Sequence, residues 1–181
     1  MPTPPTPRPS SNPPPKPVPT LRSARPDELD AVGALTVEAY VAGGVIPADA
    51  PYLAFLGDAH HRDAQAELWV AVDERGVVGT VTFVVHGSAL AEVAREGEAE
   101  IRSLAVSPTA SGEGIGEALT RLTIDRARES GCAAMVLSSS TTMRAAHRLY
   151  ERLGFTRLPE RDWSPVEGVQ LVAYTLPLQP L

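Results

Sequence analysis

Three closely spaced glycines carry the clearest chemical signal in the chain. Gly112, Gly114 and Gly116 lie in the stretch SGEGIG, between an apolar segment typical of a strand and a segment with helical periodicity. Because glycine has no Cβ, backbone N–H groups can converge there, and the dipole of a following helix adds positive potential. The loop is suited to a phosphate or pyrophosphate; the simpler interpretation is a flexible connection before a helix.

The spacing of these glycines excludes two common phosphate-binding loops. A Walker loop needs GxxxxGK followed by Ser or Thr, but Lys16 is the only lysine in the chain. The dinucleotide fingerprint GxGxxG is absent, because the glycines run G-x-G-x-G. The four histidines lack metal-binding spacing, and the single Cys132, which we interpret as a small buried hydrophobe, gives no zinc cluster. We therefore expect no metal site and no disulfide.

The elements that must position this loop alternate between strands and helices. Apolar runs rich in β-branched residues predict strands at residues 20–25, 68–72, 77–86, 99–106, 134–138, 155–158 and 169–176. Apolar residues at helical spacing predict helices at residues 26–42, 50–65, 115–130 and 141–153. This order predicts an α/β (α+β) fold in which one mixed sheet is flanked by helices.

The composition divides the chain into two parts. Ten of its 18 prolines lie in residues 1–19, which we expect to form a disordered, Pro-rich leader, since proline removes backbone donors and little there is apolar. Residues 20–181 are expected to form one domain. The net charge of −6 argues against a nucleic-acid partner. No apolar run has membrane-span length and no secretory signal is visible, so we expect a cytoplasmic protein without a membrane partner.

Two further segments complete a family pattern. Residues 100–108 (EIRSLAVSP), the glycine loop and residues 146–155 (AHRLYERLGF) resemble, in that order, the motifs of the GNAT superfamily of acyl-CoA-dependent N-acetyltransferases. The resemblance covers residues 20–178. It implies a single GNAT-like domain with a mixed, mostly antiparallel sheet, whose central parallel strand pair splays to admit CoA. It also implies acetyl-CoA as the cosubstrate and a possible homodimer.

The same resemblance implies which residues contact CoA. The backbone of Leu104, Ala105 and Val106 would pair with the pantetheine arm at the splay. The pyrophosphate would lie on the backbone amides of the loop and the first helical turn, namely Ser111, Gly112, Glu113, Gly114, Ile115, Gly116 and Glu117. Ser111 stands where the family pattern has Arg or Gln, so pyrophosphate binding would depend more on backbone amides. The carboxylates of Glu113 and Glu117 would repel phosphate unless they point outward to solvent.

Amine acetylation also needs an acid and a base. By the resemblance, Tyr150 is the acid that hydrogen-bonds the departing sulfur. Glu100 is the preferred base, directly or through water, because strand alternation would place it on the same face as Arg102, Leu104 and Val106.

Several alternatives stay open from the sequence. The nearby Glu98 and Glu96, or a water molecule, could serve as the base, and Tyr150 could be a core aromatic instead. We expect an N-acetyltransferase that transfers the acetyl group of acetyl-CoA to a primary amine, by direct transfer in a ternary complex. The alternatives are a non-catalytic CoA-binding regulatory module and an α/β scaffold that binds no CoA. The acceptor, a small-molecule or peptide amine, would be shaped by residues 40–52, a small and apolar segment with Asp49 as its only acid.

Overall fold

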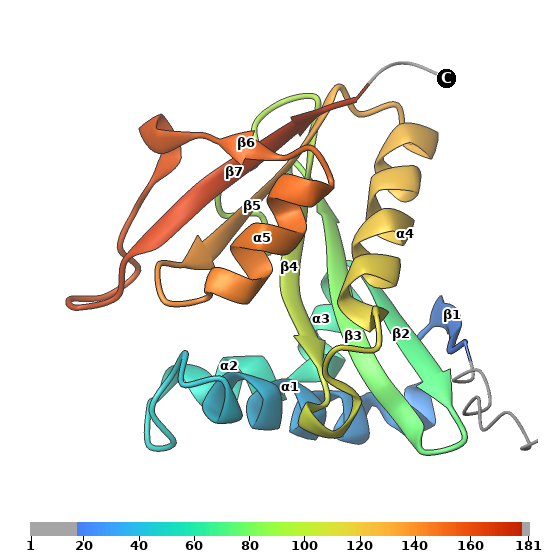
Figure 1. Cartoon of the computed structure of the whole chain (residues 1–181). Coiled ribbons are helices and arrows are strands. Elements are labelled where there is room, and N and C mark those ends of the chain that lie inside the picture. Colours follow the sequence, from blue (N-terminus) through green and yellow to red (C-terminus); the bar gives the residue numbers. More distant parts are fainter. Residues whose placement is uncertain (1–17, 179–181) are drawn as a thin grey trace, which may run out of the picture.

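A seven-stranded sheet runs through the molecule (Figure 1). The computed structural model describes residues 18–178, so residues 1–17 of the expected leader lie outside the described part and the domain boundary stays a prediction. The strands, in the order β1-β2-β3-β4-β5-β7-β6, are β1 (Thr20–Ser23), β2 (Glu67–Asp73), β3 (Gly76–Val85), β4 (Glu98–Val106), β5 (Ala134–Ser140), β7 (Leu171–Pro177) and β6 (Thr156–Arg157). Only β4 and β5 pair in parallel among these neighbours, which confirms the predicted mixed, mostly antiparallel sheet.

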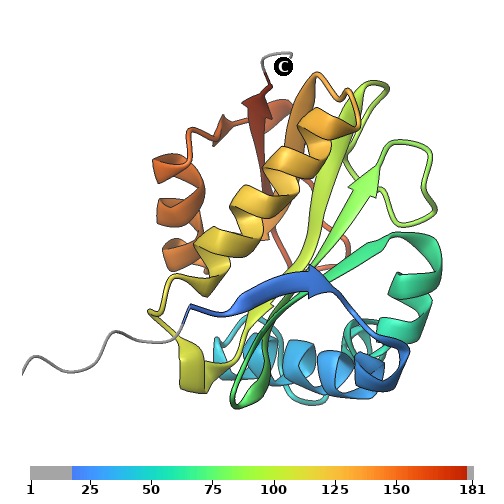
Figure 2. The same cartoon turned by 90° about the vertical axis from the view of Figure 1, so that its right-hand side faces the viewer.

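Helices cover both faces of the sheet. They are α1 (Leu29–Ala42), α2 (Tyr52–Gly57), α3 (Ala59–Gln65), α4 (Ile115–Glu129) and α5 (Arg144–Arg152). Figure 2 shows α4 and α5 on one face and α1 to α3 on the other. None of the helices in residues 18–178 combines the length and the apolar character needed to cross a membrane.

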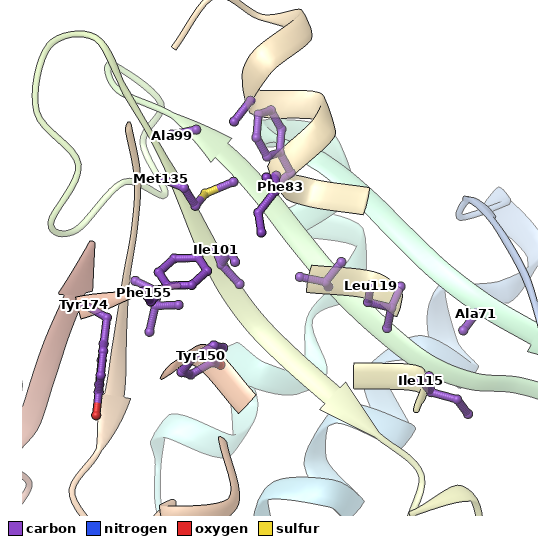
Figure 3. Packing of buried hydrophobic residues seen from close by; sticks show 14 of the residues in the cluster. Ala71, Phe83, Ala99, Ile101, Ile115, Leu119, Met135, Tyr150, Phe155 and Tyr174 are labelled. Carbon is purple, nitrogen blue, oxygen red and sulfur yellow. The ribbon is translucent and has the colours of Figure 1, made fainter. Parts of the chain in front are cut away.

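Two apolar clusters hold these layers together. The larger one lies between the sheet and helices α4 and α5 and includes Phe83, Ile101, Leu119, Tyr150 and Tyr174 (Figure 3). The smaller one lies under α1 and α3 and consists of Leu29, Val32, Ala59, Leu68 and Val70. Successive strand residues point to opposite faces, so β2 contributes side chains to both clusters.

The structure corrects the single helix predicted at residues 50–65. The chain leaves helical geometry at Asp58, where φ is −83° and ψ is 75°. The Asp58 carboxylate caps α3 by accepting the backbone N–H of His61 at 2.8 Å, and the buried Arg62 guanidinium donates to the Leu56 carbonyl of α2 at 2.5 Å. Apolar spacing could not reveal this break, because the break depends on polar contacts of Asp58 and Arg62 with the backbone.

A β-bulge in β4 is the second correction. Thr80 of β3 is opposite Ala105, but Thr82 is opposite Arg102, so β4 holds one extra residue between these pairs. Ser103, with φ of 49°, lies in this extra length. The alternation that placed Glu100, Arg102, Leu104 and Val106 on one face is therefore wrong: the side chains reverse at the bulge, and Leu104 and Val106 pack against the larger cluster instead.

The crossing of α1 over α2 depends on a glycine at close approach. A Cβ placed on Gly33 would lie 2.0 Å from the carbonyl oxygen of Gly57, a backbone atom that cannot turn aside. We expect Gly33→Ala to lower the free energy of unfolding by about 2 kcal/mol, measured by urea denaturation, because the helices must separate.

The matched control is Gly57→Ala on the facing helix. Its Cβ would meet only a Val37 methyl group at 3.5 Å, an ordinary contact, so this variant should be at least as stable as the parent. Equal stabilities for Gly33→Ala and the parent would contradict the close helix crossing.

Candidate functional site: a splayed strand pair beside a glycine loop

The two parallel strands separate halfway along their length. Their pairing runs from Glu98 opposite Ala134 to Ile101 opposite Leu137, and ends there. β4 then continues to Val106 and β5 to Ser140 without pairing to each other, and Figure 1 shows the strands diverging. Within residues 18–178, the β4 edge toward this gap carries backbone groups without a strand partner, which confirms the predicted splay.

The glycine loop lies directly beyond the end of β4. Gly112 and Gly114 have φ of +78° and +82°, values that glycine adopts without strain, and a Cβ on either would meet no atom within 4 Å. Gly114 caps α4 with its backbone alone, and the first bond of the helix runs from the Ala118 amide to the Gly114 carbonyl at 3.0 Å. The amides of the first turn therefore lack partners within the helix, as an anion site requires.

Arginines neutralise the two carboxylates beside this loop. Glu113 bonds Arg75 at 2.7 Å, so its side chain, which is 19% exposed, is held by an arginine and does not point freely into solvent. Glu117 bonds Arg121 at 2.9 Å and Arg152 at 3.3 Å, and these arginines lower the pKa of its carboxyl below the ordinary value. The repulsion of phosphate predicted from the sequence is therefore offset by ion pairs.

The remaining residues predicted to contact CoA gather near the gap. Leu104 and Val106 are partly buried against the larger cluster, and Ala105 is buried and paired with Thr80 of β3. Ser111 is exposed at the start of the glycine loop. A Cβ on Gly116 would lie 3.6 to 3.7 Å from the side chains of Leu149 and Val106, so the ends of β4, α4 and α5 meet at this point.

Tyr150 of α5 lies in the core below the gap. Its side chain is buried, and its ring centroid lies 5.8 Å from that of Phe155 and 6.0 Å from that of Tyr174 (Figure 3). Its hydroxyl forms no hydrogen bond with any residue in the described range 18–178. Burial, with smaller effects of Tyr40 and Tyr174, raises the pKa of the phenol, so it stays protonated at neutral pH and available as a donor.

Glu100 is completely buried and holds a loop. Its Oε2 accepts the backbone N–H groups of Glu92, Val93 and Ala94 at 2.9, 3.0 and 3.0 Å, while its Oε1 lies 3.8 Å from Nε of Arg102. The role of base stays a prediction for Glu100, but these contacts are those of a residue that positions the loop.

The two alternative carboxylates point elsewhere. Glu98 pairs with Arg161 at 2.5 Å; burial raises the pKa of the Glu98 carboxyl, but hydrogen bonds from Arg161 and the Arg95 amide outweigh it and leave the pKa below the ordinary value. Glu96 is exposed and lines a different depression, near Cys132.

A pocket of 310 Å³ opens at the gap. Seven of its lining residues belong to residues 40–52, and others come from β4, the end of β5 and the segment before β7. Its walls are mostly apolar and include Tyr40, Tyr52 and Trp163. A cavity of this size is typical of small-molecule sites, which span about 300–1,000 Å³.

Sequence reasoning missed the carboxylate that lines this pocket. Glu92 is 31% exposed and its Oε1 lies 2.7 Å from the Arg102 guanidinium, which also donates to the Leu90 carbonyl at 2.5 Å. Burial raises the pKa of the Glu92 carboxyl above its ordinary value, against the opposing effect of Arg102. The polar stretch 87–97 carried no motif that could single out Glu92, because only the folded loop brings it to the pocket.

Comparisons with known proteins agree with this geometry. The profile of the "Acetyltransferase (GNAT) family" matches residues 31–155. The chain is 38% identical over 103 residues to N-acetylaspartate synthetase of Danio rerio, covering 56% of this chain and 33% of that protein. It thus spans about a third of the length of the curated relatives that it matches first.

Two solved structures share the fold. A GNAT-family acetyltransferase from Staphylococcus aureus Mu50 matches with a TM-score of 0.70 and 14% identity, over 88% of this chain and 99% of that chain. The ribosomal-protein-alanine N-acetyltransferase of Brucella melitensis matches with a TM-score of 0.67 and 23% identity, over the same shares.

The contacts of Glu100 predict what its loss does. Glu100→Gln removes the charge from three hydrogen bonds in the interior, so we expect the free energy of unfolding to fall by about 2 kcal/mol. Hydrogen exchange at the amides of residues 92–94 should accelerate at the same time. Glu96→Gln, on the exposed part of the same loop, is the control and should change stability by less than about 0.5 kcal/mol. Unchanged exchange at these amides would show that Glu100 does not hold the loop.

Proposed function

Because this chain belongs to the GNAT family of acetyltransferases, we propose that it transfers an acetyl group from acetyl-CoA to a primary amine, by direct transfer in a ternary complex. The observation that carries the proposal is the meeting of three features at one place. An open strand edge, an anion cradle and a protonated phenol with no hydrogen-bond partner among the described residues lie along β4, the start of α4 and α5.

The cosubstrate fits the backbone of this chain. Pantetheine is a peptide-like arm and would pair with the open edge of β4 at Leu104, Ala105 and Val106, where β5 has turned away. The pyrophosphate would lie on the amides of residues 111–117. Ser111 contributes no long donor side chain, which leaves the phosphates to the amides, and the ion-paired Glu113 and Glu117 no longer oppose them.

The reaction has three chemical requirements: the amine must lose a proton, the thioester carbonyl must be polarised, and the leaving sulfur must be stabilised or protonated. The amine nitrogen attacks the thioester carbonyl carbon, a C–N bond forms, the C–S bond breaks, and the proton lost by the amine must be taken up. Backbone N–H groups on the open edge of β4 would polarise the carbonyl. Tyr150 would donate a hydrogen bond to the leaving sulfur, which needs a proton or its equivalent as it departs.

The acceptor does not follow from the relatives. The matched proteins carry names as different as N-acetylaspartate synthetase and ribosomal-protein-alanine N-acetyltransferase, and the chain spans only about a third of the former. The acceptor has to be inferred from the pocket at the gap.

The role of Tyr150 can be tested with one hydroxyl group. Tyr150→Phe should lower kcat about 100-fold, because the leaving thiolate loses its donor, while the dissociation constant of acetyl-CoA stays the same. The fold should be retained, since that hydroxyl makes no hydrogen bond within the described residues. Tyr174→Phe removes a hydroxyl from the same aromatic cluster and is the control. If Tyr150→Phe turned over at the parental rate, Tyr150 would have no part in the transfer.

The glycine cradle can be tested at the two ends of α4. Gly114→Ala and Gly131→Ala each put a Cβ on a residue with positive φ, +82° and +71°, where neither Cβ meets a neighbour. Both should lose about 1 kcal/mol of stability. Only Gly114→Ala should also weaken CoA binding, by about tenfold in calorimetry, because its Cβ fills the cradle.

These measurements also separate the alternatives. CoA binding without acetylation of any amine would identify a non-catalytic CoA-binding module. Absence of CoA binding to the parent would leave only a scaffold with this fold.

A further inference from the structure

The pocket at the gap has mostly apolar and aromatic walls, which suit the apolar part of a ligand. Val45 and Ile46 line it from the segment between α1 and α2, Tyr52 from the start of α2, and Trp163 and Val166 from the segment before β7. The Trp163 indole is fixed in place, because its Nε1 donates to Ser138 Oγ of β5 at 3.1 Å. Apolar and aromatic walls of this kind favour a ligand that loses apolar surface to water when it binds.

Only two charged residues line this pocket among the described residues, Glu92 and Arg102. The Arg102 guanidinium is already engaged by the Glu92 carboxylate at 2.7 Å and the Leu90 carbonyl at 2.5 Å. A ligand carboxylate would have to displace these partners. Arg102 is therefore a poor partner for an acidic acceptor.

A second carboxylate, that of Glu100, lies beside Arg102 in addition to Glu92. Glu100 lies on the other side of Arg102: its Oε1 is 3.8 Å from the Arg102 Nε and accepts no hydrogen bond from any described residue, while its Oε2 holds the loop. One guanidinium thus stands between two carboxylates, and the group as a whole carries one negative charge when both acids are ionised. A single ammonium group balances this charge, and Glu92 is the carboxylate of this group that lines the pocket.

We propose that the acceptor is a small primary amine on an apolar or aromatic body, and that Glu92 receives its ammonium group and takes up its proton. This rests on the acetyl transfer proposed above. The proton moves from the ammonium nitrogen to the Glu92 carboxylate, which leaves a neutral amine to attack the thioester. Glu92 is 31% exposed and can return the proton to solvent.

The surroundings of Glu92 set the expected pH dependence. Arg102 and Glu100 of β4 face it, and the tyrosines Tyr40 of α1 and Tyr52 of α2 interact with its charge. Both phenols titrate far above neutrality, since burial raises the pKa of Tyr40 to about 12 and that of Tyr52 above its ordinary value. The rise of rate with pH should therefore report the deprotonation of Glu92 and of the bound amine.

The test of the acceptor class uses four amines with the full-length protein and acetyl-CoA. 2-Phenylethylamine is a primary amine on an aromatic body, as proposed. Phenylalanine adds a carboxylate to it, and phenylalaninamide carries a neutral amide in place of that carboxylate. Aspartate has a second carboxylate in place of the phenyl ring. We expect kcat/KM for 2-phenylethylamine to exceed that for phenylalanine and aspartate about 100-fold, and phenylalaninamide to recover most of the loss.

The test of the residue compares two carboxylates of one loop. Glu92→Gln should lower kcat/KM for 2-phenylethylamine about 100-fold and flatten the rise of rate with pH, without changing the affinity for CoA. Glu96→Gln, which faces away from this pocket, should keep the parental profile. Thermal shifts with CoA and each amine give a second readout that needs no turnover.

Each outcome decides the question. Faster acetylation or stronger stabilisation by aspartate would overturn the acceptor class while leaving the acetyl transfer standing. A parental pH profile in Glu92→Gln would overturn the role of Glu92. Binding of CoA without acetylation of any amine would overturn the proposed transfer itself, and this inference with it.

Discussion

One extra residue in β4 is the constraint on which the site depends. The bulge at Ser103 lies immediately beyond the last residues that pair with β5, so the strand turns its next backbone groups toward a gap. It also reverses the side chains: before it, Arg102 lines the pocket and Glu100 lies beside Arg102, whereas after it Leu104 and Val106 pack against the core. Without this insertion a regular strand would bring Leu104 to the face of Arg102.

The electrostatics of the site follow from the same placement. The chain is acidic overall, yet the carboxylates nearest the glycine loop are each held by arginines from β2–β3, α4 or α5. At the pocket the balance is reversed, because a single arginine is shared between two acids. An acidic protein can thus present an anion cradle and a cation-attracting wall within one gap, since short-range pairing rather than net charge sets each local potential.

Local signals in the sequence were sufficient for most of the strands and helices and for the glycine loop, because β-branched runs, helix stops and glycines with positive φ act through their immediate neighbours. The parallel pair and its splay were expected from the resemblance to the GNAT superfamily and not from these local signals. Local signals were insufficient where a contact between residues distant in the sequence determines the local structure. The break at Asp58 depends on Arg62 reaching the end of α2, and the reversal at Ser103 depends on the register with β3. Glu92 enters the site only because a buried carboxylate eight residues later gathers its loop.

The short parallel pairing has a mechanical consequence. In the part of the chain that the structure describes, only four residue pairs, from Glu98 to Ile101, join the β1–β4 part of the sheet to the β5–β7 part. The two parts of the sheet are therefore joined over a short length, and α4 and α5 pack on the same face of both parts. A chain-like ligand bound between the diverging ends of β4 and β5 would supply hydrogen bonds that the two strands do not make to each other there. It would thereby connect the two parts of the sheet a second time. Binding of the ligand in this gap should therefore reduce the motion of the two parts of the sheet relative to each other.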